Sequence, residues 1–309
     1  MSLPARVSIV EVAPRDGLQN EKATLSPQIR AELISRLAAA GLSRIEAGSF
    51  VSPAAVPQMA HTDETLAFAS RQNVRLSVLV PNLRGLAAAL AAGADEIVVF
   101  AAASETFSKR NINCSIEESL TRYAKVVAEA RRYGVMARGY ISCVLGCPYE
   151  GEVESSRVAS VASALLEMGC FEVSLGDTIG VGAPLQARRL VERVARIAPL
   201  DKIAAHFHDT YGQALANIFA CLEVGVSVVD SSVAGLGGCP FAPGAAGNVA
   251  TEDVVYMLER MDVETGVTLD RLLEAGAFAC RELNRAPASR VAQAYAARCG
   301  DPMEAPSRR

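Results

Sequence analysis

The pattern of hydrophobic and polar positions along the 309-residue chain alternates between two kinds of segment. Short runs rich in β-branched residues, typical of strands, are each followed by a longer stretch rich in alanine and leucine, typical of a helix. Because a helix follows each strand, the pattern predicts parallel strands joined by helical crossovers. The predicted strands span residues 7–12, 44–50, 75–80, 95–100, 135–142, 171–175, 203–208 and 227–233.

The boundaries of the predicted helices carry local signals. In "SPQIRAELISRLAAAG", Ser26 is a predicted N-cap, Pro27 suits the first helical position and Gly41 ends the helix. Other helix-to-strand turns are marked in the same way by Gly93, Gly134, Gly169 and Gly225. After the last strand, residues 251–261 and 269–286 read as further helices.

Eight such units with no break in composition predict an α/β fold, a single (β/α)8 TIM barrel with additional C-terminal helices. An open, doubly wound sheet is the alternative, but eight units fit the closed form better. We expect one catalytic domain over residues 1–309, with the barrel at about 5–260, a helical appendage at about 261–300 and a frayed tail at 301–309.

The composition narrows the class of protein. Half of the residues are hydrophobic and the net charge is -4, so nothing favours general binding to nucleic acid or to an anionic membrane. The N-terminus has no secretory-signal pattern, and no apolar run is long enough for a bilayer, so we expect a cytoplasmic protein. Eight scattered cysteines are then expected to be mostly reduced and buried, without a structural zinc site.

Two of the three histidines lie one residue apart in "HFHDTYGQALAN". Since strand side chains alternate between faces, His206 and His208 share one face and Phe207 takes the other. At the C-terminal end of the seventh strand that face would point into the barrel mouth, where TIM-barrel active sites lie. Two polar residues on a solvated strand edge are the alternative. The shared inward face favours a metal-binding or catalytic pair.

Other polar residues fall at the same end of the predicted strands. Each alone could be a helix cap or an ion-pair partner, but their gathering at one rim predicts an active site. They are Arg15, Asp16, Glu46, Ser49, Tyr140, Ser174 and Asp177.

A glycine-rich segment, "GLGGCPFAPGAAGN", follows the eighth strand. It lacks the Lys-Ser/Thr of a phosphate-binding loop, and its glycines favour a mobile loop that carries Cys239 toward the barrel mouth and ends at Asn248. Two imidazoles, a carboxylate and an amide oxygen would form a nitrogen and oxygen ligand set. That set favours Mg²⁺ or Mn²⁺, with Zn²⁺ as the second choice.

Long motifs in a fixed order extend this picture: "PRDGLQNE", "SFVSP", "VPNLRG", "KRNINCSIEES", "GCPYEGE", "SLGDTIGVG", "HDTYGQALAN" and "VAGLGGCPFAPGAAGN". Through them, over roughly residues 5–296, the chain resembles the 3-hydroxy-3-methylglutaryl-CoA lyase family of the DRE-TIM metallolyases. The resemblance implies that four residues bind the metal, namely Asp16, His206, His208 and Asn248. It also implies that Arg15 stabilises an enolate, that Glu46 supports the metal and the arginine, and that Cys239 is catalytic.

The resemblance further implies a substrate cavity lined by Gln19, Ser49, Asn111, Tyr140, Ser174 and Asp177. The expected reaction is a divalent-metal-dependent retro-Claisen cleavage that yields acetyl-CoA and acetoacetate, as in leucine degradation, with Asp16 or a histidine such as His206 as the base. The expected partner is an acyl-CoA, with no nucleic acid and no membrane. We also expect a homo-oligomer, either a dimer or a tetramer.

Three positions depart from the family pattern, namely Ala13, Gly48 and Phe207. Gly48 would widen the acyl pocket, so a lyase for a longer-tailed 3-hydroxyglutaryl-CoA is one alternative. A Claisen-condensing synthase of the same group is another, although the long loop with its cysteine favours the lyase. A non-catalytic metal- or CoA-binding barrel would have lost a ligand or Arg15, and none is lost.

Overall fold

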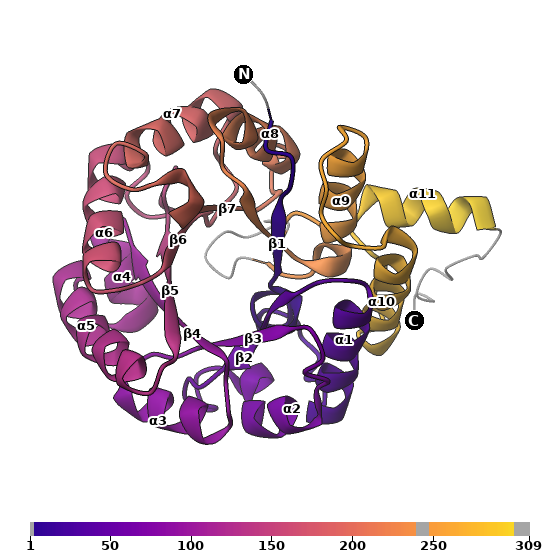
Figure 1. Cartoon of the computed structure of the whole chain (residues 1–309), viewed down its shortest axis with the longest axis horizontal. Coiled ribbons are helices and arrows are strands. Elements are labelled where there is room, and N and C mark those ends of the chain that lie inside the picture. The colour runs from indigo at the N-terminus through magenta and orange to yellow at the C-terminus, as the bar shows by residue number, and fades with distance from the viewer. Residues whose placement is uncertain (1–2, 239–246, 300–309) are drawn as a thin grey trace.

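The computed structural model describes residues 3–238 and 247–299, which form a closed barrel of parallel strands surrounded by helices (Figure 1). β1 pairs with β2 on one side and with β8 on the other, which excludes the open sheet and confirms the TIM barrel. Each strand bound lies within two residues of the predicted one. The strands are β1 (Ser8–Glu11), β2 (Arg44–Ser49), β3 (Arg75–Leu79), β4 (Glu96–Ala102), β5 (Met136–Ser142), β6 (Glu172–Asp177), β7 (Ile203–Phe207) and β8 (Val228–Ser231).

Helices form the outer ring. They are α1 (Pro27–Ala39), α2 (Thr62–Phe68), α3 (Leu83–Ala91), α4 (Glu105–Ile112), α5 (Ile116–Arg132), α6 (Ser155–Glu167), α7 (Pro184–Val194), α8 (Ala214–Val224) and α9 (Thr251–Glu259). Short helical turns are η1 (Ala13–Gly17), η2 (Pro57–Met59), η3 (Leu200–Lys202) and η4 (Val233–Gly235). None of the described helices is both long enough and apolar enough to cross a membrane.

The start of α1 has the predicted N-cap. The hydroxyl of Ser26 accepts a hydrogen bond from the backbone N–H of Ile29, and Pro27 opens the helix. Gly41 adopts a φ of 103°, a left-handed conformation that glycine tolerates better than other residues. The predicted cap, first residue and stop of this helix are therefore confirmed.

The helices after the barrel lie beside its seam. α10 (Leu269–Glu282) packs against α1, and α11 (Arg290–Cys299) packs against α9, so both lie on the side of the ring where the barrel closes (Figure 1). α10 was expected as a separate helix, and α11 lies within the helical appendage expected at about 261–300. The expected tail at 301–309 lies outside the described residues.

The barrel interior is more polar than the branched apolar layers usual for this fold. A small apolar cluster of Val10, Val12, Ala204 and Val228 fills one part of it. Charged side chains of the barrel strands are also buried, among them Arg138, Glu172 and Asp230. Six cysteines are free and buried in the described part of the chain, as expected for a protein with reduced thiols.

Candidate active site

The turn η1 presents Arg15 and Asp16 at the C-terminal end of β1. Buried Glu11 holds this turn, because its carboxylate accepts hydrogen bonds from the backbone N–H groups of Ala13, at 2.9 Å, and Val233, at 3.0 Å. Gly17 has no room for a side chain, since a Cβ there would lie 2.8 Å from the hydroxyl of Ser232. The "RDG" sequence thus lets η1 pack directly against the segment that follows β8.

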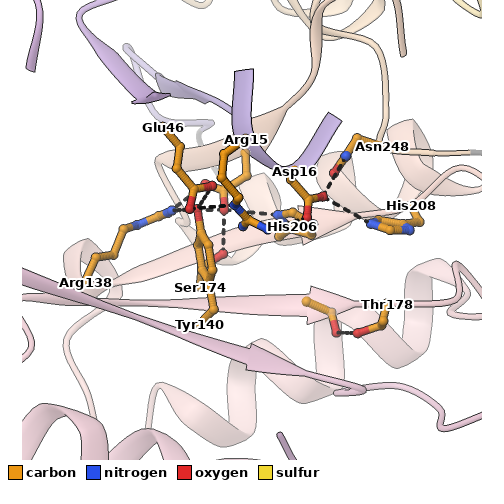
Figure 2. A network of polar contacts seen from close by, with 12 residues as sticks. Arg15, Asp16, Glu46, Arg138, Tyr140, Ser174, Thr178, His206, His208 and Asn248 are labelled. Atoms are coloured by element: carbon orange, nitrogen blue, oxygen red, sulfur yellow. Dashed lines mark hydrogen bonds and ion pairs between the residues drawn. The ribbon is translucent and has the colours of Figure 1, made fainter. Parts of the chain in front are cut away.

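Asp16, His206 and His208 converge on one point (Figure 2). One ligand atom from each residue lies within 4.8 Å of the other two. His206 lies in β7 and His208 directly follows it, while Phe207 packs into the core between barrel and helices. The alternation of strand side chains therefore brings both imidazoles to the barrel mouth, beside the Asp16 carboxylate from the turn η1 that follows β1.

Asn248 completes this cluster from the far end of the glycine-rich segment. Its side-chain amide donates to the Asp16 carboxylate at 2.9 Å and to the backbone carbonyl of Leu236 at 3.3 Å. The chain before Asn248 passes very close to the chain after Leu236, because a Cβ on Gly247 would lie 2.5 Å from the carbonyl carbon of Gly237. Glycine at these positions thus permits close backbone contact.

Arg15 lies between two carboxylates (Figure 2). Its Nη1 donates to Asp16 Oδ1 at 2.7 Å, and its Nε forms an ion pair with Glu46 Oε1 at 2.8 Å that lacks the alignment of a hydrogen bond. Its guanidinium carbon lies 5.6 Å from the centre of the Tyr140 ring, a distance at which cation and aromatic face attract. These contacts leave the Arg15 side chain little freedom.

The electrostatics of this group favour a charged arginine and a charged aspartate. Burial alone would lower the pKa of Arg15, but Glu46 and then Asp16 raise it above its usual value. Burial alone would raise the pKa of Asp16, but Arg15 and then the contact with His208 hold it well below its usual range. The pKa of Glu46 is raised, because complete burial outweighs the neighbouring Arg15.

The donor set fits a divalent cation. One carboxylate and two imidazoles lie close enough to share an ion, and no thiolate is among them. Of the two ring nitrogens of His206, Nδ1 already contacts Asp230 at 3.2 Å, which leaves Nε2 for a ligand. The residues present are therefore chemically suited to a metal that accepts nitrogen and oxygen ligands.

A buried network beneath the site was not predicted. Arg138 in β5 donates to both carboxylate oxygens of Asp230 in β8, at 2.7 and 3.0 Å, and to Glu172 at 2.5 Å. It also donates to the hydroxyl of Tyr140, which in turn donates to Glu46. The available signal was the placement of an arginine and an aspartate within barrel strands, where a charged residue needs a buried partner.

Three of the expected cavity residues lie in a barrel strand or at its end, and two of them have polar partners of their own. The hydroxyl of Ser174 donates to Asp230 at 2.7 Å. The carboxylate of Asp177 accepts from the backbone N–H groups of Val181 and Gly182, and burial raises its pKa. Ser49 ends β2 with a buried hydroxyl that has no partner among the described residues.

Two further cavity candidates are less enclosed. Gln19 is half-buried just after η1, and Asn111 is exposed in the last turn of α4. Cys239, the expected catalytic thiol, lies outside the described residues.

The expectation for Gly48 is wrong. A Cβ on Gly48 would lie 2.6 Å from the hydroxyl oxygen of Thr62, so the space next to this glycine is occupied by α2 and not by an acyl pocket. The cause is an irregular register between β2 and β3, at Glu46 and Gly48, which interrupts the simple alternation of faces.

Comparison with known proteins identifies the family of the chain. The HMGL-like family model matches residues 6–278. The chain is 56% identical over 294 residues to the mitochondrial hydroxymethylglutaryl-CoA lyase of Homo sapiens, covering 95% of this chain and 90% of that protein. It is also 56% identical over 299 residues to the 3-hydroxy-3-isohexenylglutaryl-CoA/hydroxy-methylglutaryl-CoA lyase of Pseudomonas aeruginosa, covering 96% of this chain and all of that protein.

A solved structure is similar over nearly the whole barrel. The crystal structure of hydroxymethylglutaryl-CoA lyase from Pseudomonas aeruginosa matches with a TM-score of 0.94 at 56% identity, over 96% of this chain and 100% of that chain. The family model thus spans most of the chain, and the relatives agree with it in sequence and in fold. The chain belongs to the HMGL-like family.

Proposed function

We propose that the protein is a carbon–carbon lyase that cleaves 3-hydroxy-3-methylglutaryl-CoA to acetyl-CoA and acetoacetate. The observation that carries the proposal is the convergence of Arg15 with the cluster of Asp16, His206 and His208 at the mouth of the barrel. Lyases 56% identical to this chain support the reaction class. No observation favours the condensing synthase or the non-catalytic barrel.

Each group has a role in this reaction. Asp16, His206, His208 and Asn248 would hold a divalent cation, which supplies Lewis-acid polarisation of the substrate oxygens when it is bound. Asp16 or a histidine takes the proton from the substrate hydroxyl, and the C–C bond then breaks to release acetoacetate and leave the enolate of acetyl-CoA. Cys239 or a water then delivers a proton to the enolate carbon, which completes acetyl-CoA. Arg15 offers N–H donors to the enolate oxygen, where negative charge develops. Glu46 and Tyr140 keep the guanidinium in place through the contacts described above.

The choice of acyl group follows from two observations. The relative from Pseudomonas aeruginosa is named for both a methyl and an isohexenyl substrate. However, the feature that suggested a wider pocket, Gly48, faces Thr62. We therefore propose the methyl-bearing substrate as the physiological one, in leucine degradation, with Mg²⁺ or Mn²⁺ ahead of Zn²⁺.

Four further expectations belong to this proposal. The chain acts as a single catalytic domain, in a homo-oligomer, in the cytoplasm. Gln19, Ser49, Asn111, Tyr140, Ser174 and Asp177 line the substrate cavity.

Release of acetyl-CoA tests the proposal. The purified protein is incubated with 3-hydroxy-3-methylglutaryl-CoA or with a longer-tailed analogue, each with Mg²⁺, with Mn²⁺ and with EDTA. We expect the methyl substrate to give the higher kcat/KM, and we expect EDTA to abolish turnover. Asp16→Ala and His206→Ala should each reduce turnover by several orders of magnitude without unfolding the barrel. Full activity after complete removal of metal would refute the mechanism.

The proposed role of Cys239 predicts selective alkylation. Six of the other cysteines, namely Cys114, Cys143, Cys147, Cys170, Cys221 and Cys280, are buried, so they should react slowly with a thiol reagent. A thiol that serves the barrel mouth from a glycine-rich segment should react quickly, and the reaction should inactivate the enzyme. A substrate analogue should protect it. Cys239→Ser should remove the fast-reacting site and lower turnover while metal affinity stays unchanged. A Cys239→Ser variant with the wild-type rate would exclude a catalytic role.

A further inference from the structure

Asp230 lies directly beside His206 inside the barrel. The two residues are paired in the register between β7 and β8, so both side chains point into the barrel interior. Asp230 is 1% exposed, and its Oδ2 lies 3.2 Å from His206 Nδ1. The carboxylate is thus on the side of the imidazole that faces away from the proposed metal position.

The position of the Asp230 carboxylate is fixed by other donors. Two N–H groups of Arg138 bind its two oxygens, at 2.7 and 3.0 Å, and the hydroxyl of Ser174 donates to Oδ2 at 2.7 Å. Arg138 is held in turn by Glu172 on the other side. Since both oxygens are engaged, the Asp230 carboxylate has one stable orientation in the barrel.

This arrangement determines which nitrogen of His206 carries the proton. An ionised carboxylate only accepts hydrogen bonds, so the ring nitrogen that faces it must be the N–H. The lone pair of the neutral ring is then on Nε2, which is the form that a metal ligand needs. Without the carboxylate, no acceptor would hold the proton on Nδ1, and the ring could exchange tautomers. A fixed acceptor behind a ligating histidine therefore favours metal binding before any metal arrives.

We propose that Asp230 is a positioning residue that holds His206 as the Nδ1–H tautomer and thereby raises the affinity of the Asp16, His206 and His208 cluster for a divalent cation. This inference rests on the proposed metal site. Ser174 and Arg138 act one step further away, by orienting Asp230. The competing explanation is that Asp230 only neutralises the buried charge of Arg138.

The tautomer can be measured in the wild-type protein. The chain has three histidines, so a sample labelled with ¹⁵N-histidine gives few ring signals. His61→Gln identifies the exposed ring on the surface, and His206→Asn identifies the ring in question. At mildly alkaline pH without metal, we expect Nδ1 of His206 to show the shift of a protonated nitrogen and Nε2 that of an unprotonated one. Addition of Mg²⁺ should then move the Nε2 signal. The opposite tautomer, or rapid exchange between both, would overturn the inference.

The affinity for Mn²⁺ tests the energetic consequence. Asp230→Asn keeps the size of the side chain but removes the charge, and we expect the Kd for Mn²⁺ to rise roughly 10- to 100-fold. The matched control is Glu172→Gln, which removes the other carboxylate partner of Arg138 without touching His206. Its Tm should fall, but its Kd for Mn²⁺ should stay close to the wild-type value.

The outcomes separate the inference from the proposed function. If His206→Ala abolishes Mn²⁺ binding and Asp230→Asn leaves the Kd unchanged, then the metal site stands and the role of Asp230 is refuted. If His206→Ala binds Mn²⁺ like the wild type, then the proposed site itself is wrong. If both carboxylate variants weaken Mn²⁺ equally, then Asp230 acts only through Arg138. If Asp230→Asn does not fold, the tautomer of the wild-type protein decides.

Discussion

Arg15 is a buried cation in the site, so its charge requires close anionic partners. It is 6% exposed and is flanked by the carboxylates of Asp16 and Glu46. Such a buried cation is stable only with close anionic partners, and those partners also aim its donors. The same contacts that keep Arg15 charged therefore prepare it for a developing oxyanion.

Replacement of Arg15 should affect chemistry more than metal binding. Arg15→Met keeps much of the aliphatic stem and loses the fork of donors, so we expect kcat to fall by on the order of 10²-fold or more, about 3 kcal/mol of transition-state stabilisation. Bound Mn²⁺ per protein should stay unchanged. Steady-state kinetics and metal analysis on the same sample check both points.

Arg15→Lys is the informative second variant, because it restores the charge without the planar fork. It should recover only part of the loss if directed donors matter. A large rise in KM with normal kcat in Arg15→Met would instead assign Arg15 to ground-state binding.

Two short helical turns hold segments of the site in place: η1 carries Arg15 and Asp16, and η4 precedes the glycine-rich segment. η1 is held by Glu11, as described above, and η4 is held by Glu252 at the start of α9. Both carboxylate oxygens of Glu252 accept from the backbone N–H of Ala234, which has a left-handed φ of 58°. A non-glycine residue in this conformation needs local support. The buried carboxylate supplies it at the base of the glycine-rich segment.

The burial of Glu252 predicts a dependence of stability on pH. Burial raises its pKa from 4.5 to about 8, so between these values the folded protein keeps a proton that the unfolded chain has lost. The free energy of unfolding should therefore decrease as pH rises from 4.5 to about 8, and this contribution should then level off. Glu252→Gln cannot ionise and should lose this contribution, which is on the order of a few kcal/mol over the whole range.

Urea unfolding of the wild type and Glu252→Gln at several pH values in that range measures the difference. Glu152→Gln, at an exposed loop position, is the control and should show a difference from the wild type that does not change with pH. A constant difference for Glu252→Gln as well would mean that Glu252 is ionised throughout.

For the molecule as a whole, the sequence predicted the barrel and the polar residues at its mouth, but not the buried network of charged side chains beneath them. Strand and helix periodicities are local patterns, so they predict the strands, and the number of strand–helix units predicts the closed barrel. The pairing of Arg138 with Asp230 links residues 92 positions apart, and only the closed barrel brings them together. The bulge that turns Gly48 toward Thr62 is likewise a property of paired strands.

The start of α11 is fixed by one interaction within its own sequence and by others with a residue distant in the chain. The hydroxyl of Ser289 accepts a hydrogen bond from the backbone N–H of Ala292, which is a local N-cap signal. Asp253 in α9 also binds the hydroxyl of Ser289 and the backbone N–H groups of Arg290 and Val291. That anchor lies far back in the chain, and no periodicity in residues 290–299 indicates it.

The proposed cation would join segments from both ends of the chain, since Asp16 follows β1, His206 lies in β7 and Asn248 follows the glycine-rich segment. The unfolded chain does not bring these residues together, so a bound metal should stabilise the folded state by about 2.7 kcal/mol at a free concentration of 100 Kd. For a chain of this size that corresponds to a rise in Tm of a few degrees. Thermal unfolding with Mn²⁺ and with EDTA measures it.

Asp16→Ala should abolish the difference between the two conditions. Asp201→Ala, an exposed residue of η3 at the opposite end of β7, should preserve it. This comparison does not depend on turnover, so it tests the metal site separately from the chemistry. If Mn²⁺ raised the Tm of Asp16→Ala as much as that of the wild type, the stabilising ion would be bound elsewhere, and the ligand set proposed for the barrel mouth would have to be abandoned.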